Sequence, residues 1–136
     1  MSDIPERYRD LPRSAFGDGP ALADELLDRV IAGRKTATCM MADDPNRPRV
    51  GQHWIVLDGR GEPACVIQTT ELTERRFDEV DDAFARDEGE GDRTLDTWRR
   101  NHRIYFGRLG TFEEDITLVC ERFRLVEVLR GPGARA

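Results

Sequence analysis

The segment from Pro20 to Met41 constrains the fold most, because it joins a clear helix to a clear strand through one glycine. Proline stands at the first helical position, directly after Gly19, and apolar residues follow it at helical spacing. Gly33 then occupies the position just past the helix end, where a positive φ is favoured. Residues 36–41 are small, β-branched or apolar, and they predict a short strand. A helix that packs against a sheet is therefore the first expectation.

Lys35 lies in the turn between this helix and this strand, and it is the only lysine in the chain. An ammonium is a compact charge whose pKa burial can lower, whereas a guanidinium stays protonated. Lys35 is therefore the first candidate site residue, and a chance lysine at an exposed helix end is the alternative. In a regular strand Lys35 and Thr38 would point to opposite sides. They converge on one cleft only if the chain is still turning at Lys35.

The composition describes one globular domain. A chain of 136 residues with 38% hydrophobic and 35% charged residues holds a single core and a polar surface. It has no apolar run of membrane-spanning length and no signal-peptide pattern at its start, so a cytoplasmic location without membrane contact is expected. Cys39, Cys65 and Cys120 lie in strand-like runs and are predicted to be buried thiols. The net charge of −6 argues against sequence-independent binding of nucleic acid.

Hydrophobic periodicity predicts the remaining elements. Residues 1–15 form a polar N-terminal arm, residues 16–129 the domain, and residues 130–136 a flexible glycine-rich tail. The domain continues with a hairpin, two helices and a long strand, over His53–Leu57, Ala64–Leu72, Phe77–Ala85, Arg93 or Thr94 to about Phe106, and Ile116–Val128. The acidic run from Asp87 to Asp92, with its two glycines, predicts a loop rich in carboxylates. This order of elements is typical of an α+β domain.

The stretch Gly33-Arg34-Lys35-Thr36-Ala37-Thr38, read as GxKxxT, resembles the signature of the ASCH domain family. Three later blocks follow in the order expected of bacterial members: VGQHWIVLDGRGEPACVIQTTEL, FDEVDDAFARDEGEGDRTLDTWRRNH and VCERFRLVEV. The resemblance therefore covers roughly Phe16 to Val128. It implies a small PUA-like mixed or antiparallel β-barrel with flanking helices, and a cleft that binds RNA or a modified nucleoside. Met40 stands where the family motif often carries an arginine, so the contact made by that arginine is not implied here.

The resemblance also implies a chemistry. In some members a Lys-Thr-Glu set is thought to remove the acetyl group from N4-acetylcytidine. Lys35 and Thr38 match the first two positions, and the third falls on Glu88 or, with a different gap, on Glu90. A threonine hydroxyl becomes a nucleophile when a lysine or a raised-pKa glutamate accepts its proton, and an ammonium can instead stabilise the oxyanion. This set predicts an amidohydrolase without a metal or other cofactor, with Glu88 as the preferred acid.

Two other functions remain open at this point. A metal-dependent ribonuclease would use oxygen ligands for Mg²⁺ or Mn²⁺ from Glu88, Glu90, Asp92 and Glu121. The chain has no His/Cys spacing of a zinc site, and a loop of solvated acids is the commoner fate of such a run.

The other open function is a non-catalytic module, which would bind RNA or a nucleotide through the same cleft. Lys35 would contact a phosphate or carbonyl, and Thr38 would donate a hydrogen bond. His102 is either a wall residue of this cleft or a satisfied core histidine. The candidate substrate contacts are Arg34, Glu90, Trp98, His102 and Arg122.

Overall fold

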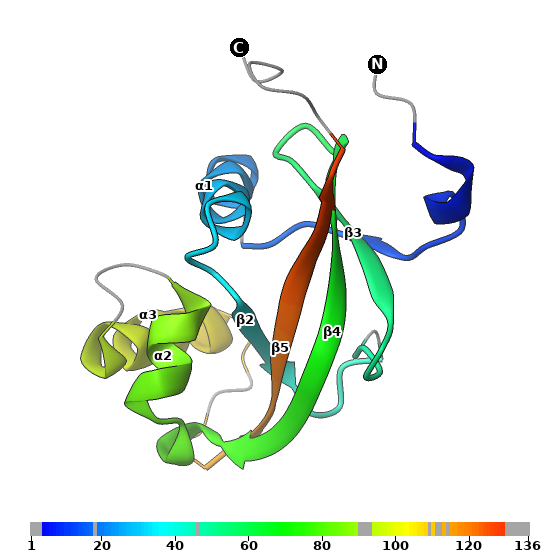
Figure 1. Ribbon diagram of the computed structural model, residues 1–136. Helices are drawn as coiled ribbons and strands as arrows, with labels where there is room; N and C mark the ends of the chain where they lie inside the picture. The colour runs from blue at the N-terminus through cyan, green and yellow to red at the C-terminus, as the bar shows by residue number, and fades with distance from the viewer. Residues whose placement is uncertain are drawn as a thin grey trace.

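The structure is a computed structural model that describes residues 4–17, 19–45, 47–89, 94–108, 110, 113 and 115–129. Its centre is one five-stranded mixed sheet with the strand order β1-β3-β4-β5-β2 (Figure 1). The strands are β1 (Arg13–Ser14), β2 (Ala37–Met41), β3 (His53–Leu57), β4 (Pro63–Arg76) and β5 (Thr117–Val128). Three helices accompany the sheet: α1 (Pro20–Ile31), α2 (Asp82–Glu88) and α3 (Leu95–Arg108). The predicted α+β class is confirmed.

Strands β4 and β5 form the longest antiparallel ladder, from Cys65 opposite Val128 to Arg76 opposite Thr117. They lie side by side along the length of the molecule in Figure 1. Two register shifts interrupt the ladder, between Val66 and Ile67 and between Thr69 and Glu71. Such irregularities bend a strand and increase its twist, which curves the sheet around what lies beside it.

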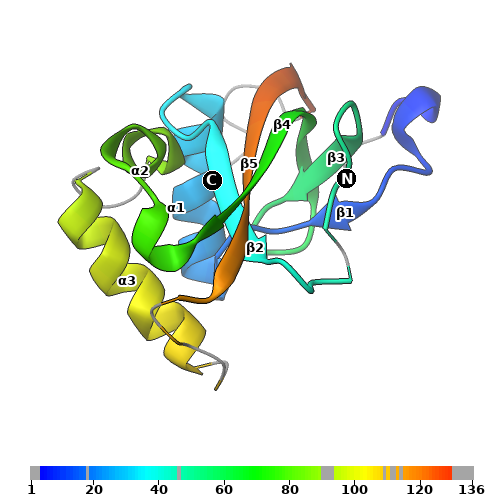
Figure 2. The ribbon, with the colours of Figure 1, turned by 90° about the horizontal axis from the view of Figure 1, so that it is seen from below.

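The sheet has two different edges. At one edge β2 pairs antiparallel with β5, with Cys39 opposite Cys120. At the other edge the two-residue strand β1 pairs parallel with β3. This second pairing draws the segment predicted as a polar arm onto the sheet, and Tyr8 of a short 3-10 helix (Glu6–Tyr8) is buried with Ile55 and Val66. Figure 2 shows β1 beside β3 and β2 beside β5.

Helix α1 has the boundaries that its sequence predicts. Pro20 is at its first turn, Gly33 has φ +80° just past its end, and Leu27 and Val30 are fully buried against the sheet. Full burial of one such side chain is worth about 1.5–3 kcal/mol, so this apolar face fixes the helix in place. The fixed position of α1 in turn fixes where the chain begins β2.

Helices α2 and α3 cover the β2 end of the sheet around a second apolar cluster. The cluster's buried members come from β2, β5, the segment before α2 and both helices: Ala37, Phe77, Val80, Phe84, Ala85, Trp98, Phe106, Leu118 and Cys120. A 3-10 helix, Phe77–Glu79, precedes α2, and Asp81 caps α2 by accepting a hydrogen bond from the backbone N–H of Phe84. The predicted single helix over Phe77–Ala85 is thus two short helices.

The fold differs from the sequence prediction at the end of α2. The helix continues through Glu88, which the acidic run had placed in a loop, and Gly89 ends it in the left-handed conformation with φ +69°. Glu90, Asp92 and the predicted tail 130–136 lie outside the described residues. Within the part of the chain that is described, none of the helices has the length and apolar character that crossing a membrane requires.

Candidate functional site

Lys35 points into the protein. Its backbone N–H and that of Arg34 both donate to the carbonyl of Arg29, so the chain is still turning at this point, as convergence with Thr38 requires. The Lys35 residue is only 1% exposed, and its Nζ faces three acceptors: Ala37 O at 2.8 Å, Glu88 O at 3.2 Å and Glu88 Oε1 at 3.4 Å. An ammonium has three N–H donors, so these contacts match its full capacity. Lys35 is therefore a fixed buried cation.

Glu88 is the counter-ion of Lys35 and is itself only 1% exposed. Its Oε2 accepts hydrogen bonds from Trp98 Nε1 and from the Cys39 thiol at 3.6 Å, and lies 3.2 Å from His102 Nε2. Burial alone would raise the pKa of Glu88, but the charges of His102 and Lys35 and the hydrogen bonds from His102 and Trp98 together lower it to about 2. Glu88 is therefore a buried carboxylate held by donors on every side.

The backbone around Gly89 locks this pair together. Thr36 N–H donates to Asp87 O at 2.7 Å, which ties the start of β2 to the end of α2. A Cβ at position 89 would lie 2.3 Å from the carbonyl oxygen of Arg34, so glycine is required there for space as well as for its φ. Arg29 of α1 also donates to the carbonyl of Gly89. The segments that carry Lys35 and Glu88 are thus fixed in register.

His102 completes the cluster from α3. Its Nδ1 lies 2.8 Å from the carbonyl oxygen of Trp98, one helical turn earlier, and its Nε2 faces Glu88. Both partners are acceptors, so a proton on each ring nitrogen satisfies both contacts. The ring also stacks on Trp98, with centroids 4.2 Å apart. Lys35 and His102 therefore flank one carboxylate.

These side chains border a cavity of about 790 Å³. Its wall brings together residues from several segments, among them Lys35, Thr38, Cys39, Glu88, His102 and Glu121. Phe16 and Trp54 supply aromatic surface, and Lys35 Nζ lies 5.2 Å from the centre of the Phe16 ring. Small-molecule sites have volumes of about 300–1,000 Å³ and a few converging polar groups. The cavity fits this description.

A second buried carboxyl lines the cavity from β5. Glu121 is 4% exposed and accepts a hydrogen bond from Thr69 Oγ1 at 2.5 Å. Burial raises the pKa of Glu121 above its ordinary value, although the Thr69 hydrogen bond and the charge of Lys35 act in the other direction. The cavity wall therefore carries two carboxyl groups with opposite preferences for a proton.

The structure brings together some of the candidate site residues and separates others. Lys35, Thr38, Glu88 and His102 all line the cavity, whereas Trp98 lies behind Glu88 as a donor. Arg122 is turned toward Asp87 and Glu71, and Arg34 is exposed; among the described residues, neither belongs to the cavity wall. Glu90 is not among the described residues.

Sequence reasoning missed one face of α3. Asn101, Ile104, Tyr105 and Arg108 line the cavity and are spaced as one helical stripe, next to the buried stripe of Trp98, His102 and Phe106. The signal was the helical period of these four residues. It was hidden because three of them are ordinary surface residue types, and the sequence does not reveal which polar face of a helix meets a cavity. Cys39 of β2 was predicted only as a buried thiol and Glu121 of β5 only as a possible metal ligand, because the sequence does not show which strand residues face the cavity.

The sequence profile of the ASCH domain matches residues 12–127. The chain belongs to the ASCH domain family. The ASCH domain is an RNA-binding module with a PUA-like fold. Membership of the family therefore implies nucleic-acid binding in general terms, without a specific substrate or activity. A search of curated proteins finds no match.

Two solved structures resemble this ASCH domain closely. The ASCH domain from Lactobacillus crispatus JV V101 is 32% identical, with a TM-score of 0.81 over 90% of this chain and 83% of that one. Protein EF3133 from Enterococcus faecalis V583 is 33% identical, with a TM-score of 0.79 over 87% of this chain and 77% of that one. The ASCH protein from Zymomonas mobilis, at 10% identity and a TM-score of 0.54 over 77% of this chain and 66% of that one, shares the fold alone.

Proposed function

We propose that this ASCH domain binds a modified nucleoside, free or within RNA, in the cavity beside Lys35. The observation that carries the proposal is the cavity of about 790 Å³ with a buried ammonium, a hydroxyl and two buried carboxyl groups in its wall. A base with its sugar fits a cavity of this size, and these groups offer donors and acceptors to the edge of a base.

The face of α3 that lines the cavity supports the proposal of a nucleic-acid ligand. Tyr105 is 41% exposed and lines the cavity beside Arg108 and Asn101. Aromatic rings stack on unpaired bases, and a guanidinium pairs with phosphate. The formal charge of −6 opposes binding to RNA along its backbone. Recognition of one extruded nucleotide at one cleft is consistent with both observations.

Hydrolysis of an amide on the bound base, as in N4-acetylcytidine, is the second candidate function. It is supported by the shared cavity wall of Lys35, Thr38 and Glu88. Thr38 would attack the acyl carbon, its proton would leave with the cytidine N4 amine, and water would then release the acid. Lys35 would be a poor base, because its ammonium is held by three acceptors, and it would stabilise the oxyanion through its charge rather than through a further hydrogen bond. With its pKa lowered to about 2, Glu88 would hold Lys35 and would not accept the proton of Thr38.

The experiment separates binding from turnover. Calorimetry measures the affinity of wild type for cytidine and N4-acetylcytidine, and chromatography follows release of cytidine. Thr38→Val keeps the shape of the wall, so we expect retained affinity and turnover reduced by about 100-fold or more. Thr70→Val, at an exposed position on strand β4, which β5 separates from β2, is the matched control and leaves both unchanged.

Each outcome decides between the functions. Binding without turnover in wild type retains the binding module and removes the hydrolase. Cleavage of RNA that depends on Mg²⁺ or Mn²⁺ would favour the ribonuclease instead. Absence of binding to both nucleosides and to RNA oligonucleotides that contain them overturns the proposal.

A further inference from the structure

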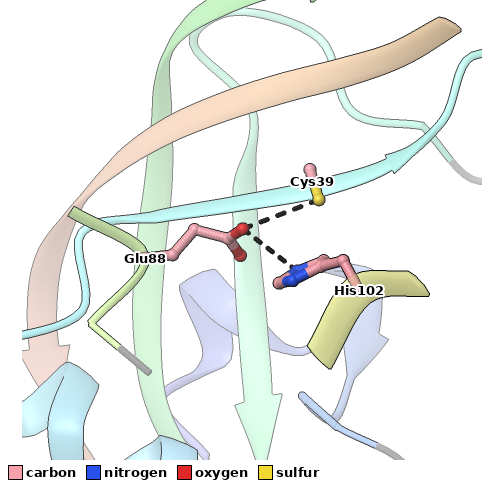
Figure 3. A group of neighbouring side chains, drawn as sticks. All are labelled: Cys39, Glu88 and His102. Carbon is pink, nitrogen blue, oxygen red and sulfur yellow. Dashed lines mark hydrogen bonds and ion pairs between the residues drawn. The ribbon is translucent and has the colours of Figure 1, made fainter. Parts of the chain in front are cut away.

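Three side chains with metal-binding atoms meet at one wall of the cavity. Cys39 comes from β2, Glu88 from the end of α2 and His102 from α3, and all three point toward one another (Figure 3). Their ligand atoms lie within 4.8 Å of one another. We propose that Cys39 Sγ, Glu88 Oε2 and His102 Nε2 bind a divalent transition-metal ion of the Zn²⁺ type, with one coordination position directed to the cavity.

Two of the three distances between these atoms match a tetrahedral zinc site, and all three atoms lie within 4.8 Å of one another. Zinc bond lengths at a tetrahedral angle place nitrogen and oxygen ligands about 3.4 Å apart, and sulfur and oxygen ligands about 3.6 Å apart. His102 Nε2 lies 3.2 Å from Glu88 Oε2, and Cys39 Sγ lies 3.6 Å from the same oxygen. A metal ion bound by all three atoms would keep these two distances close to their present values.

The surroundings already orient the ligands. His102 Nδ1 donates to the Trp98 carbonyl, which leaves Nε2 for the metal and fixes the ring. Lys35 holds the other carboxylate oxygen, Oε1. Donors from Trp98, Cys39 and His102 all converge on Oε2, although a carboxylate oxygen has about two lone-pair sites. A metal ion would replace the contacts that Cys39 and His102 make with Oε2. It would occupy one lone pair of this oxygen, and the indole N–H of Trp98 would keep the other.

Charge balance favours the exchange. With a proton on Cys39 Sγ and on His102 Nε2, the Lys35 ammonium and the imidazolium outweigh the Glu88 carboxylate by one positive charge. A dication that displaces these two protons leaves the same net charge in the cluster. Burial of the cluster therefore does not oppose metal entry, since the cost of burying charge depends on the charge that remains.

The residue types select the metal. Thiolate and imidazole favour Zn²⁺ and Co²⁺ over Mg²⁺, which prefers oxygen ligands. Three protein ligands with an open fourth position are typical of reactive zinc sites, whereas structural sites are closed by four. All three residues line the cavity, so a ligand in the cavity could reach the open position. The proposal does not depend on which nucleoside the cavity takes.

Cobalt provides the direct test. Metal-free protein is titrated with CoCl₂, and absorption reports thiolate-to-cobalt charge transfer, while ZnCl₂ competes for the same site. We expect one metal per chain, no competition by MgCl₂, and a higher melting temperature with Zn²⁺. Zinc titrations in buffers of different ionisation enthalpy should show release of two protons.

Matched variants localise the site. Cys39→Ser should abolish the charge-transfer band, and His102→Gln should weaken Co²⁺ binding by more than about 100-fold. Cys65→Ser and His53→Gln, which alter another cysteine and the only other histidine, should leave the band intact. Circular dichroism checks the fold of each variant, and the wild-type titration decides independently of them. Absence of a 1:1 cobalt complex in wild type, or a band that survives in Cys39→Ser, overturns the proposal.

Discussion

Two buried carboxyl groups border the same cavity and differ in what surrounds them. Glu88 lies between Lys35 and His102 and has a lowered pKa, whereas Glu121 is held by the hydroxyl of Thr69 and has a raised pKa. Both residues are 4% exposed or less, so burial does not explain the difference. Charged partners keep the Glu88 carboxyl ionised at neutral pH, whereas burial beside a neutral partner raises the tendency of Glu121 to hold a proton.

The difference suggests a division of tasks in the wall. Glu88 organises the cluster, because three segments direct side chains at it. Glu121 offers the cavity a group that can donate or accept a hydrogen bond, according to its protonation.

Glu88→Gln should produce the largest loss of stability. The amide leaves Lys35 and His102 buried without their counter-charge, which costs about 3–5 kcal/mol in the free energy of unfolding. Urea denaturation at neutral pH measures the change. Glu121→Gln is the matched control, since its amide oxygen still accepts from Thr69 and its change should stay below about 1 kcal/mol. Equal losses in the two variants would remove the contrast.

Acid should remove the stabilisation that the ionised Glu88 gives to the fold. The pKa of Glu88 is lowered in the fold from its ordinary value of 4.5 to about 2, so its contribution is complete above pH 4.5 and is lost as the pH falls toward 2. Unfolding free energies of wild type and Glu88→Gln should therefore converge across this window. A constant difference from pH 6 to pH 2 contradicts the ionised state of Glu88.

Gly89→Ala should destabilise more than a similar change elsewhere. Alanine at a positive φ costs about 1–2 kcal/mol, and at position 89 its Cβ also meets the Arg34 carbonyl. Gly61→Ala is the control, because Gly61 has φ +80° with nothing within 4 Å of the added Cβ. Thermal unfolding compares the two variants. If Gly89→Ala lowers the melting temperature no more than Gly61→Ala does, the backbone at Arg34 moves away from the added Cβ without a measurable cost.

Glu121 should give the smallest effect, with the opposite sign in pH. Its raised pKa means that the folded state keeps a proton that the unfolded chain has lost, so its contribution declines as the pH rises above its ordinary value of 4.5. Glu121→Gln should remove this decline. Unfolding free energies between pH 4 and pH 8 measure it, and an unchanged slope in the variant would place the titration on another group.

The sequence predicted the fold where local signals and packing agree. Pro20 and Gly33 bound α1 as expected, because helix starts and ends depend on local backbone preferences. The short strand β1 was missed, since a two-residue parallel pairing leaves no periodicity to detect. The end of α2 was also missed. Gly89 lies inside an acidic run that was interpreted as one loop. Its close contact with Arg34 joins segments that are far apart in the sequence, so no local pattern predicts it.

The site was predicted in part for a similar reason. Lys35 was predicted as a site residue because it is the only lysine. Its convergence with Thr38 required the chain to turn at Lys35, and Gly33 permits that turn. The role of Trp98 as a donor to Glu88 was not predicted, because the stripe of Trp98, His102 and Phe106 looked like an apolar helix face. No spacing in the chain reveals that Cys39 meets Glu88 and His102, which lie 49 and 63 positions further on.

The buried position of Lys35 has a practical consequence for kinetics. The chain has a single ε-amine, and the fold withdraws it almost completely from solvent. Acylating reagents can react with it only when a local opening of the fold exposes its nitrogen. The labelling rate of this one amine, read by mass spectrometry against that of the α-amine, therefore reports how often the pocket opens in the native state.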